Sequence, residues 1–162
     1  MILKSLSKAW ISQMKNNISY VLRFHNFFRE RIGELKSHVS KLRKALPAEE
    51  YKQHELTKLL ARLYDAIENV IPENPHNPDY MLKGSLAKFK RYKKGLQRHR
   101  LLFCSAKNPP IIVYLYVSDK DHLRKEGDKN DPYNEFLKLF KSSVFSHDPF
   151  DPNMQNRLSH EL

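Results

Sequence analysis

The sequence predicts an α+β fold in which an N-terminal helical hairpin packs on a small curved antiparallel sheet and a C-terminal helix closes the domain. Three observations support this prediction. Apolar residues recur at helical spacing over residues 28–70, the period changes to that of strands over residues 88–117, and a helix-start signal follows at residue 131. With 162 residues and 40% apolar content, the chain can bury one substantial core.

The predicted hairpin consists of two amphipathic stretches that flank Pro47. A short link between two such helices makes them antiparallel neighbours. Prolines at positions 72, 75 and 78 are expected to end the second helix and to force an extended loop. The apolar residues of each stretch step by three or four positions and so share one stripe of a helix: Phe28, Ile32, Leu35, Val39, Leu42 and Leu46, then Leu56, Leu60, Leu63, Ile67 and Val70.

The two ends of the chain are expected to differ from this body. Residues 1–24 are basic, free of acid and apolar at helical spacing, as in a mitochondrial targeting peptide, but Lys outnumbers Arg there. We interpret them as a mature N-terminal helix that packs on the body or on a partner. Residues 1–17 then form an extension and residues 18–146 the domain. Residues 147–162 lack periodicity and predict a flexible tail.

Three strands in hairpin order are predicted between residues 88 and 117. Residues 88–93 and 98–103 alternate in character, and residues 111–117 are rich in β-branched and aromatic side chains. Gly95 and the run Asn108-Pro109-Pro110 separate the strands, which implies an antiparallel meander. The last helix begins with Asp131 as N-cap and Pro132 at the first helical position, and its apolar face comprises Tyr133, Phe136, Leu137 and Phe140.

The charge distribution points to a polyanionic partner. The formal net charge is +11, and the block from Tyr80 to Ser118 contains nine Lys or Arg residues and no Asp or Glu. A long acid-free block inside a folded body favours nucleic acid as the partner. A solvated face and an acidic protein partner remain the alternatives.

Other classes of protein fit the sequence poorly. Cys104 is the single cysteine, which excludes an internal disulfide framework and fits the reducing cytoplasm. The longest apolar run, Ile111–Val117, is far below the roughly 20 residues of a membrane helix, so we expect a soluble protein with no membrane partner. The four glycines form no nucleotide-binding fingerprint and the eight histidines are scattered, so we expect no cofactor and no metal.

Several motifs, taken in order, resemble the YhaV family of bacterial type II toxins, which belongs with the RelE-like ribonuclease toxins. The resemblance covers roughly residues 18–145 and is carried by HELTKLLARLYDAIENVIPENPHNPDY, by Phe89, Arg91, Lys93 and Gly95, by RHRLLF, and by YVSDKDHLRKEGDKNDPYNEF. It implies a RelE-like fold whose concave sheet face cleaves mRNA, on the translating ribosome. It also implies a PrlF-like antitoxin as partner, with operator DNA reached only through the toxin–antitoxin complex.

The chemistry of a metal-independent ribonuclease can be matched to particular residues. The 2′-OH of the RNA is the nucleophile, so the enzyme needs proton acceptors and donors and cations that stabilise the pentacoordinate phosphorane. Arg98 and Arg100 would share one face of a strand, about 6.5–7 Å apart, and could straddle a phosphate. Tyr133 matches the Asp-x-Tyr element of the family and could transfer a proton. The alternative is a purely structural role, in which its ring packs in the core and its hydroxyl contacts solvent.

Further basic residues complete the predicted RNA surface. The resemblance places Arg91 and Lys93 beside the Arg-x-Arg pair, and Lys94 adds general attraction for RNA. Asp119 and Asp121, together with Lys125, could form the other side of the site, although loop solvation is their ordinary explanation. His99 has a suitable unperturbed pKa, but strand alternation would turn it away from Arg98 and Arg100.

One departure from the family weakens the enzymatic interpretation. The family often has another Arg at the position of Cys104, on the same strand parity as the Arg-x-Arg pair. A missing preorganised cation can cost a few kcal/mol of transition-state stabilisation. The alternative hypothesis is therefore a noncatalytic protein that binds RNA or the ribosome, a degenerate toxin that retains antitoxin binding.

Overall fold

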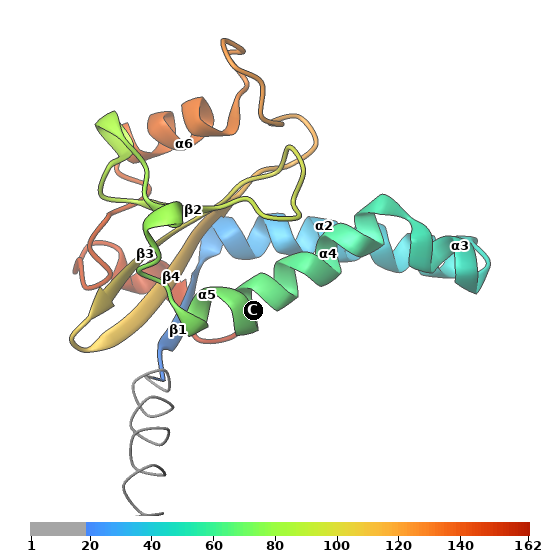
Figure 1. Ribbon diagram of the computed structural model, residues 1–162, viewed down its shortest axis with the longest axis horizontal. Helices are drawn as coiled ribbons and strands as arrows, with labels where there is room; N and C mark the ends of the chain where they lie inside the picture. The colour runs from blue at the N-terminus through green and yellow to red at the C-terminus, as the bar shows by residue number, and fades with distance from the viewer. Residues whose placement is uncertain (1–18) are drawn as a thin grey trace, which may run out of the picture.

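A five-stranded mixed sheet lies at the centre of the fold, with helices on both faces (Figure 1). The computed structural model describes residues 19–162, so the extension predicted for residues 1–17 lies outside the described residues. The strand order is β2-β3-β4-β1-β5. The strands are β1 (Val21–His25), β2 (Lys90–Tyr92), β3 (Leu101–Lys107), β4 (Pro110–Val117) and β5 (Leu158–Ser159).

The predicted meander is confirmed, but the prediction of a purely antiparallel sheet is wrong. Strands β2, β3 and β4 pair antiparallel in sequence order, whereas β1 pairs parallel with β4, with Val21 opposite Ile111. The predicted N-terminal helix was expected to extend to residue 24. This is wrong for residues 21–24, which form part of strand β1. Helical spacing upstream concealed the short strand, in which Phe24 is buried against the core while Val21 is exposed. A parallel pair requires a long crossover, and the segment from α2 to β3 provides it.

One face of the sheet is covered by α2 (Asn26–Ala45) and α4 (Glu55–Asp65), which lie side by side. The short α3 (Ala48–Gln53) joins them beyond the edge of the sheet (Figure 1). Where one helix was predicted over residues 56–70, α4 continues as a π-helical segment (Ala66–Val70) and α5 (Ile71–Glu73). None of the helices within residues 19–162 is both long and apolar enough to cross a membrane.

The first core cluster lies between these helices and the sheet. Tyr114 of β4 is fully buried in this cluster, and its hydroxyl donates a hydrogen bond to the Ile67 carbonyl in the π-helical segment (2.8 Å). Aromatic and aliphatic side chains from both layers fill the space between them. They include Phe24, Phe28, Ile32, Leu63, Ile67, Leu101, Phe103 and Tyr114.

The opposite face carries α6 (Pro132–Lys141), whose start confirms the prediction. Asp131 is the N-cap, and its Oδ1 accepts a hydrogen bond from the Tyr133 backbone N–H (3.0 Å). Three short 3₁₀ turns, Pro78–Tyr80, Gly84–Leu86 and Gln155–Arg157, connect the main elements. The second core cluster lies under α6 and includes Phe89, Leu102, Cys104, Val113, Tyr116, Phe136, Phe145 and Met154.

The C-terminal segment differs from the expected flexible tail. Its strand β5 pairs with β1 and covers that edge of the sheet. Met154 packs in the cluster under α6, while Leu162 packs against the cluster on the other face, so the segment wraps around the edge. The side chains of Asp148 and Asp151 each accept a hydrogen bond from the backbone N–H two residues later in the chain. These local turns have no period, which explains why the sequence pattern suggested no structure.

Candidate functional site

Arg98 and Arg100 lie in an irregular turn that precedes β3, which corrects their placement on a regular strand. Gly95 and Gln97 both adopt positive φ angles (74° and 54°), so strand alternation does not extend through this segment. Arg100 is nevertheless held next to the sheet, because its backbone N–H donates to Ser118 Oγ (2.9 Å) and its carbonyl accepts from the Ser118 N–H (3.1 Å). The spacing expected from a strand rise therefore does not apply to the two arginines.

Arg98 is fastened to the loop that follows β4. The Arg124 backbone N–H donates to the Arg98 carbonyl (2.8 Å), and Arg98 Nε donates to the Arg124 carbonyl (3.1 Å). Two hydrogen bonds in opposite directions fix these residues relative to one another. Arg124 therefore belongs to the same site as Arg98, although the sequence analysis did not single it out.

Asp131 connects Arg124 to the start of α6. The buried Asp131 carboxylate accepts from Arg124 Nη1 (2.6 Å) and from the Lys125 backbone N–H (2.8 Å) through Oδ2, while Oδ1 caps the helix. Arg124 also lies over the ring of Tyr133, with its guanidinium carbon 5.4 Å from the ring centroid. The N-cap carboxylate thus positions both an arginine and the tyrosine that follows it.

Tyr133 reaches the sheet face, as its predicted role requires. Arg91 in β2 lies opposite Leu102, whose side chain belongs to the cluster under α6. Its Nη1 lies 3.5 Å from the Tyr133 hydroxyl, at the long limit for a hydrogen bond. We call Arg91, Tyr133, Arg124 and Arg98 the cationic cluster, since in this order each residue contacts the next through the interactions given above.

Three of the predicted site arginines have no acidic partner within residues 19–162. Among residues 19–162, Arg91, Arg98 and Arg100 form no ion pair with a carboxylate, and they donate instead to backbone carbonyls and to the Tyr133 hydroxyl. The Nε atoms of Arg91 and Arg100 are buried and have no hydrogen-bond partner among the described residues. Guanidinium groups in this condition can bind phosphate oxygens without first breaking an ion pair.

The predicted RNA-binding lysines occupy two places. Lys93 and Lys94 are exposed and line, with Arg91, a cavity of about 540 Å³ beside Asp79 and Tyr80. Lys125 is exposed in the loop next to Arg124, and its backbone N–H bonds to the Asp131 carboxylate. The structure therefore brings Arg91, Lys93 and Lys94 together and places Lys125 next to Arg124, away from that cavity lining.

Asp119 belongs to a separate ionic network that links α2 to α6. Arg31 contacts both Glu135 carboxylate oxygens (3.1 and 3.0 Å) and Asp119 (3.3 Å). His122 bridges Asp119 and Glu135 through its two ring nitrogens (2.7 and 2.8 Å). Burial alone would raise the pKa of Asp119, but the hydrogen bond from His122 and the Arg31 charge outweigh it and lower that pKa. This network had no sequence signal, because its members come from three separate elements.

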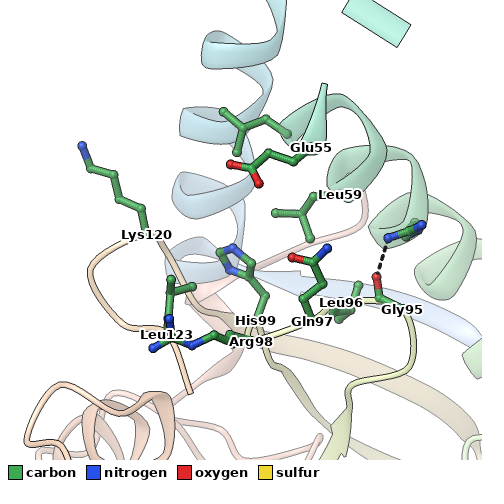
Figure 2. A pocket seen from close by; sticks show the side chains of 11 residues that line it. Glu55, Leu59, Gly95, Leu96, Gln97, Arg98, His99, Lys120 and Leu123 are labelled. Carbon is green, nitrogen blue, oxygen red and sulfur yellow. Dashed lines mark hydrogen bonds between the residues drawn. The ribbon is translucent and has the colours of Figure 1, made fainter. Parts of the chain in front are cut away.

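His99 is fixed against the loop after β4. Its Nδ1 lies 3.0 Å from the Ser118 carbonyl oxygen and 3.2 Å from Ser118 Oγ. Burial lowers its pKa, with the Ser118 carbonyl acting in the opposite direction. The sequence analysis predicted that His99 turns away from Arg98, but both side chains line one pocket of about 270 Å³ (Figure 2). The irregular turn explains the difference, since residues 97–99 do not alternate as a strand does.

Cys104 is a core residue and does not line the cationic cluster. Its side chain is buried opposite Val113 and packs in the cluster under α6. Burial raises the pKa of its thiol far above the usual range. The cysteine therefore occupies a packed apolar position, which argues against its being a gap in a phosphate site.

Comparisons with known proteins identify relatives of this chain. "Ribonuclease toxin YhaV" from Escherichia coli strain K12 is 33% identical over 137 residues, which cover 82% of this chain and 86% of the relative; "Toxin YhaV" from Escherichia coli O157:H7 matches equally well. The RelBE2 toxin–antitoxin complex of Mycobacterium tuberculosis matches 64% of this chain and 94% of its own at 17% identity, with a TM-score of 0.43, a likeness too low to bear on the site.

A family profile described as "Toxin with endonuclease activity, of toxin-antitoxin system" matches residues 22–154. The matched range begins in β1, extends through α6 and ends within the C-terminal segment that wraps the sheet edge. It therefore includes every residue of the cationic cluster. The chain belongs to the YhaV family, toxins with endonuclease activity that form part of toxin–antitoxin systems.

Proposed function

We propose that this toxin is a metal-independent endoribonuclease that cleaves mRNA at the cationic cluster together with Arg100. The observation that carries the proposal is that Arg91, Arg98 and Arg100 form no ion pair with a carboxylate among the described residues. A relative with 33% identity is named a ribonuclease toxin, which supports RNA as the substrate of the family's endonuclease activity. The acid-free block that contains these arginines supports the same polyanionic substrate.

The proposed reaction uses the RNA's own 2′-OH as nucleophile. Its oxygen attacks the neighbouring phosphorus, its proton passes to a base, and the bond from phosphorus to the 5′-oxygen breaks. The products are a 2′,3′-cyclic phosphate and a 5′-hydroxyl end. Arg98 and Arg100 stabilise the negative charge that develops on the phosphorane, because preorganised donors are most effective where charge appears in the transition state.

Tyr133 is the proposed proton donor to the departing 5′-oxygen. Its hydroxyl lies 3.5 Å from Arg91 Nη1, and its ring lies beneath Arg124. Two neighbouring cations stabilise the phenolate that remains after the proton has moved. Arg91, Lys93, Lys94 and Lys125 bind the flanking phosphates, since the three lysines are exposed and add positive charge next to Arg91 and Arg124.

The proposed setting is the cytoplasm, on the translating ribosome. The partner that holds the toxin inactive is a PrlF-like antitoxin, and contact with operator DNA runs through the toxin–antitoxin complex. The basic surface supports both assignments, because ribosomal RNA and an acidic antitoxin segment are each attracted to it.

In vitro translation with mapping of mRNA ends tests the proposal. We expect the wild-type protein to cut mRNA when ribosomes are present, to do so equally well with a chelator, and to leave 2′,3′-cyclic phosphate ends. Arg98→Ala and Arg100→Ala should each reduce cleavage by about a hundredfold or more. Exposed Arg43 lies near the far end of α2, so Arg43→Ala removes an equal charge elsewhere and should leave cleavage unchanged.

Two results would contradict the proposal. Full cleavage by both variants would remove the arginines from the mechanism. Wild-type protein that binds RNA with strong salt dependence but leaves mRNA uncut with ribosomes present would support the noncatalytic alternative.

A further inference from the structure

The pocket shared by Arg98 and His99 has apolar walls beside a basic surface. It lies between α4, the turn before β3 and the loop after β4 (Figure 2). Its volume is about 270 Å³, enough for a flat ring system rather than for one or two waters. Leucines from all three segments form its walls: Leu56, Leu59, Leu96 and Leu123.

Cations outnumber acids among the side chains that line this pocket. Arg62, Arg98 and Lys120 contribute positive charge, and Glu55 is the one acid in the lining. Arg62 Nη1 donates to the Gly95 carbonyl (3.0 Å), a hydrogen bond that joins α4 to the turn. The balance of charge suits an anionic ligand with an apolar, flat part.

His99 presents a defined hydrogen-bonding edge to the pocket. Assigning the hydrogen to Nδ1 satisfies the Ser118 carbonyl at 3.0 Å, which can only accept. In the neutral ring, which the lowered pKa favours, Nε2 is then an acceptor. Gln97 and Glu55 add polar groups to the same lining, as Figure 2 shows.

We propose that this pocket binds one unstacked base of the RNA substrate, next to a phosphate held by Arg98. The leucines contact the faces of the base, and His99, Gln97 and Glu55 contact its edge. Sequence-selective proteins read single-stranded RNA in this way, with bases splayed into pockets beside backbone contacts. The inference rests on the proposed function, since Arg98 is assigned to phosphate there, and it adds a site that selects the substrate.

Binding of a short fluorescently labelled RNA, measured by anisotropy, tests this proposal on the full chain. The probe carries 2′-O-methyl groups throughout, which prevent cleavage, and an abasic residue at each position in turn. We expect one position at which loss of the base weakens binding about tenfold or more, because the apolar contacts of that base with the leucines are lost. Loss of other bases should have smaller effects.

Variants that fill the pocket connect this effect to its residues. Leu123→Trp should weaken binding of the intact RNA by a similar factor and abolish the difference between intact and abasic RNA. Leu56→Trp, which fills the pocket from α4, should give the same result. Asn130 is exposed in the same loop and does not line the pocket, so Asn130→Trp should behave as wild type.

Three outcomes separate this inference from its alternatives. An unchanged abasic profile in Leu123→Trp and Leu56→Trp overturns it. If those variants lose antitoxin binding but keep the RNA profile, the pocket is a protein-docking surface and the inference fails. If mRNA is cleaved but no abasic position weakens RNA binding more than the others, the inference fails and the proposed function stands. If one abasic position weakens binding but mRNA is not cleaved, the proposed function fails and the pocket still binds a base.

Discussion

Arg124 Nη1 lies 2.6 Å from Asp131 Oδ2, and this ion pair connects the start of α6 to the loop that holds Arg98. Asp131 is 4% exposed, while the Arg124 side chain is 33% exposed. The carboxylate is therefore buried and structural, while the guanidinium reaches the surface. One aspartate thus serves as helix cap, ion-pair partner and support for Tyr133.

Replacing Asp131 with Asn should cost both stability and cleavage. The substitution keeps the shape but removes the charge, so Arg124 loses its partner and the loop loses its anchor. We expect the free energy of unfolding to fall by about 2 kcal/mol, as measured by urea denaturation. RNA cleavage should fall as well, because Arg124 would no longer be held over Tyr133.

Asp128→Asn is the matched control for that change. Asp128 lies in the same loop, and its Oδ1 accepts a backbone hydrogen bond from Asn130 (2.8 Å) without pairing with an arginine. We expect an effect below about 0.5 kcal/mol. Equal losses in the two variants would mean that the Arg124–Asp131 pair has no special role.

Tyr133→Phe isolates the proposed proton transfer. The ring keeps its place under Arg124 and only the hydroxyl is removed, so folding and RNA affinity should change by less than about twofold. The cleavage rate should fall by about 10²- to 10⁴-fold, the usual contribution of a general acid. Single-turnover cleavage of saturating RNA measures the rate without interference from binding.

Tyr51→Phe provides the comparison, since Tyr51 lies on α3, away from the cationic cluster. Removing the Tyr51 hydroxyl should leave the cleavage rate unchanged. Wild-type rates in Tyr133→Phe would show that another group protonates the 5′-oxygen, and Tyr133 would then be only a support for Arg91 and Arg124.

The parts of the site that the sequence predicted are those with local signals. The start of α6 follows from Asp131 and Pro132 alone, and the basic block follows from counting charges. The sequence also suggested that the Tyr133 hydroxyl could reach the sheet face, although not that it would lie next to Arg91.

The parts that were missed depend on contacts between distant segments. Arg124 becomes part of the site through hydrogen bonds to Arg98 and Asp131, which no period encodes. The turn at Gln97 requires a positive φ in a residue other than glycine, so strand alternation was extended too far. Strand β1 is only five residues long and pairs in parallel with β4, which is far away in sequence.

Buried histidines should make the fold less stable in mild acid. Burial lowers the pKa of His25 from its ordinary value of 6.5 to about 4. The hydrogen bond to the Val144 carbonyl raises this pKa, and the charge of Arg157 lowers it further. Between these values the unfolded chain binds a proton that the folded chain does not. Stability should therefore fall as pH falls from 6.5 to 4, by up to about 3 kcal/mol for one such histidine.

Urea denaturation at several pH values measures this slope. His76, whose pKa burial also lowers to about 4, should contribute in the same direction. His25→Asn should reduce the dependence of stability on pH. His160 is exposed, so His160→Asn should leave that dependence unchanged. A slope that His25→Asn leaves intact would assign the acid sensitivity to other groups.

The single cysteine should be unreactive until the chain unfolds. Cys104 is 1% exposed in the cluster under α6, and burial raises the pKa of its thiol, so little thiolate forms and reagents cannot reach it. A disulfide reagent should label no thiol in the native protein and one thiol per chain in urea, where the count is unambiguous because the chain has one cysteine. Cys104→Ala should cleave RNA at the wild-type rate, with a stability loss of about 1 kcal/mol. Rapid labelling of the native protein, or loss of cleavage in Cys104→Ala at full stability, would instead place this residue at the RNA-binding surface.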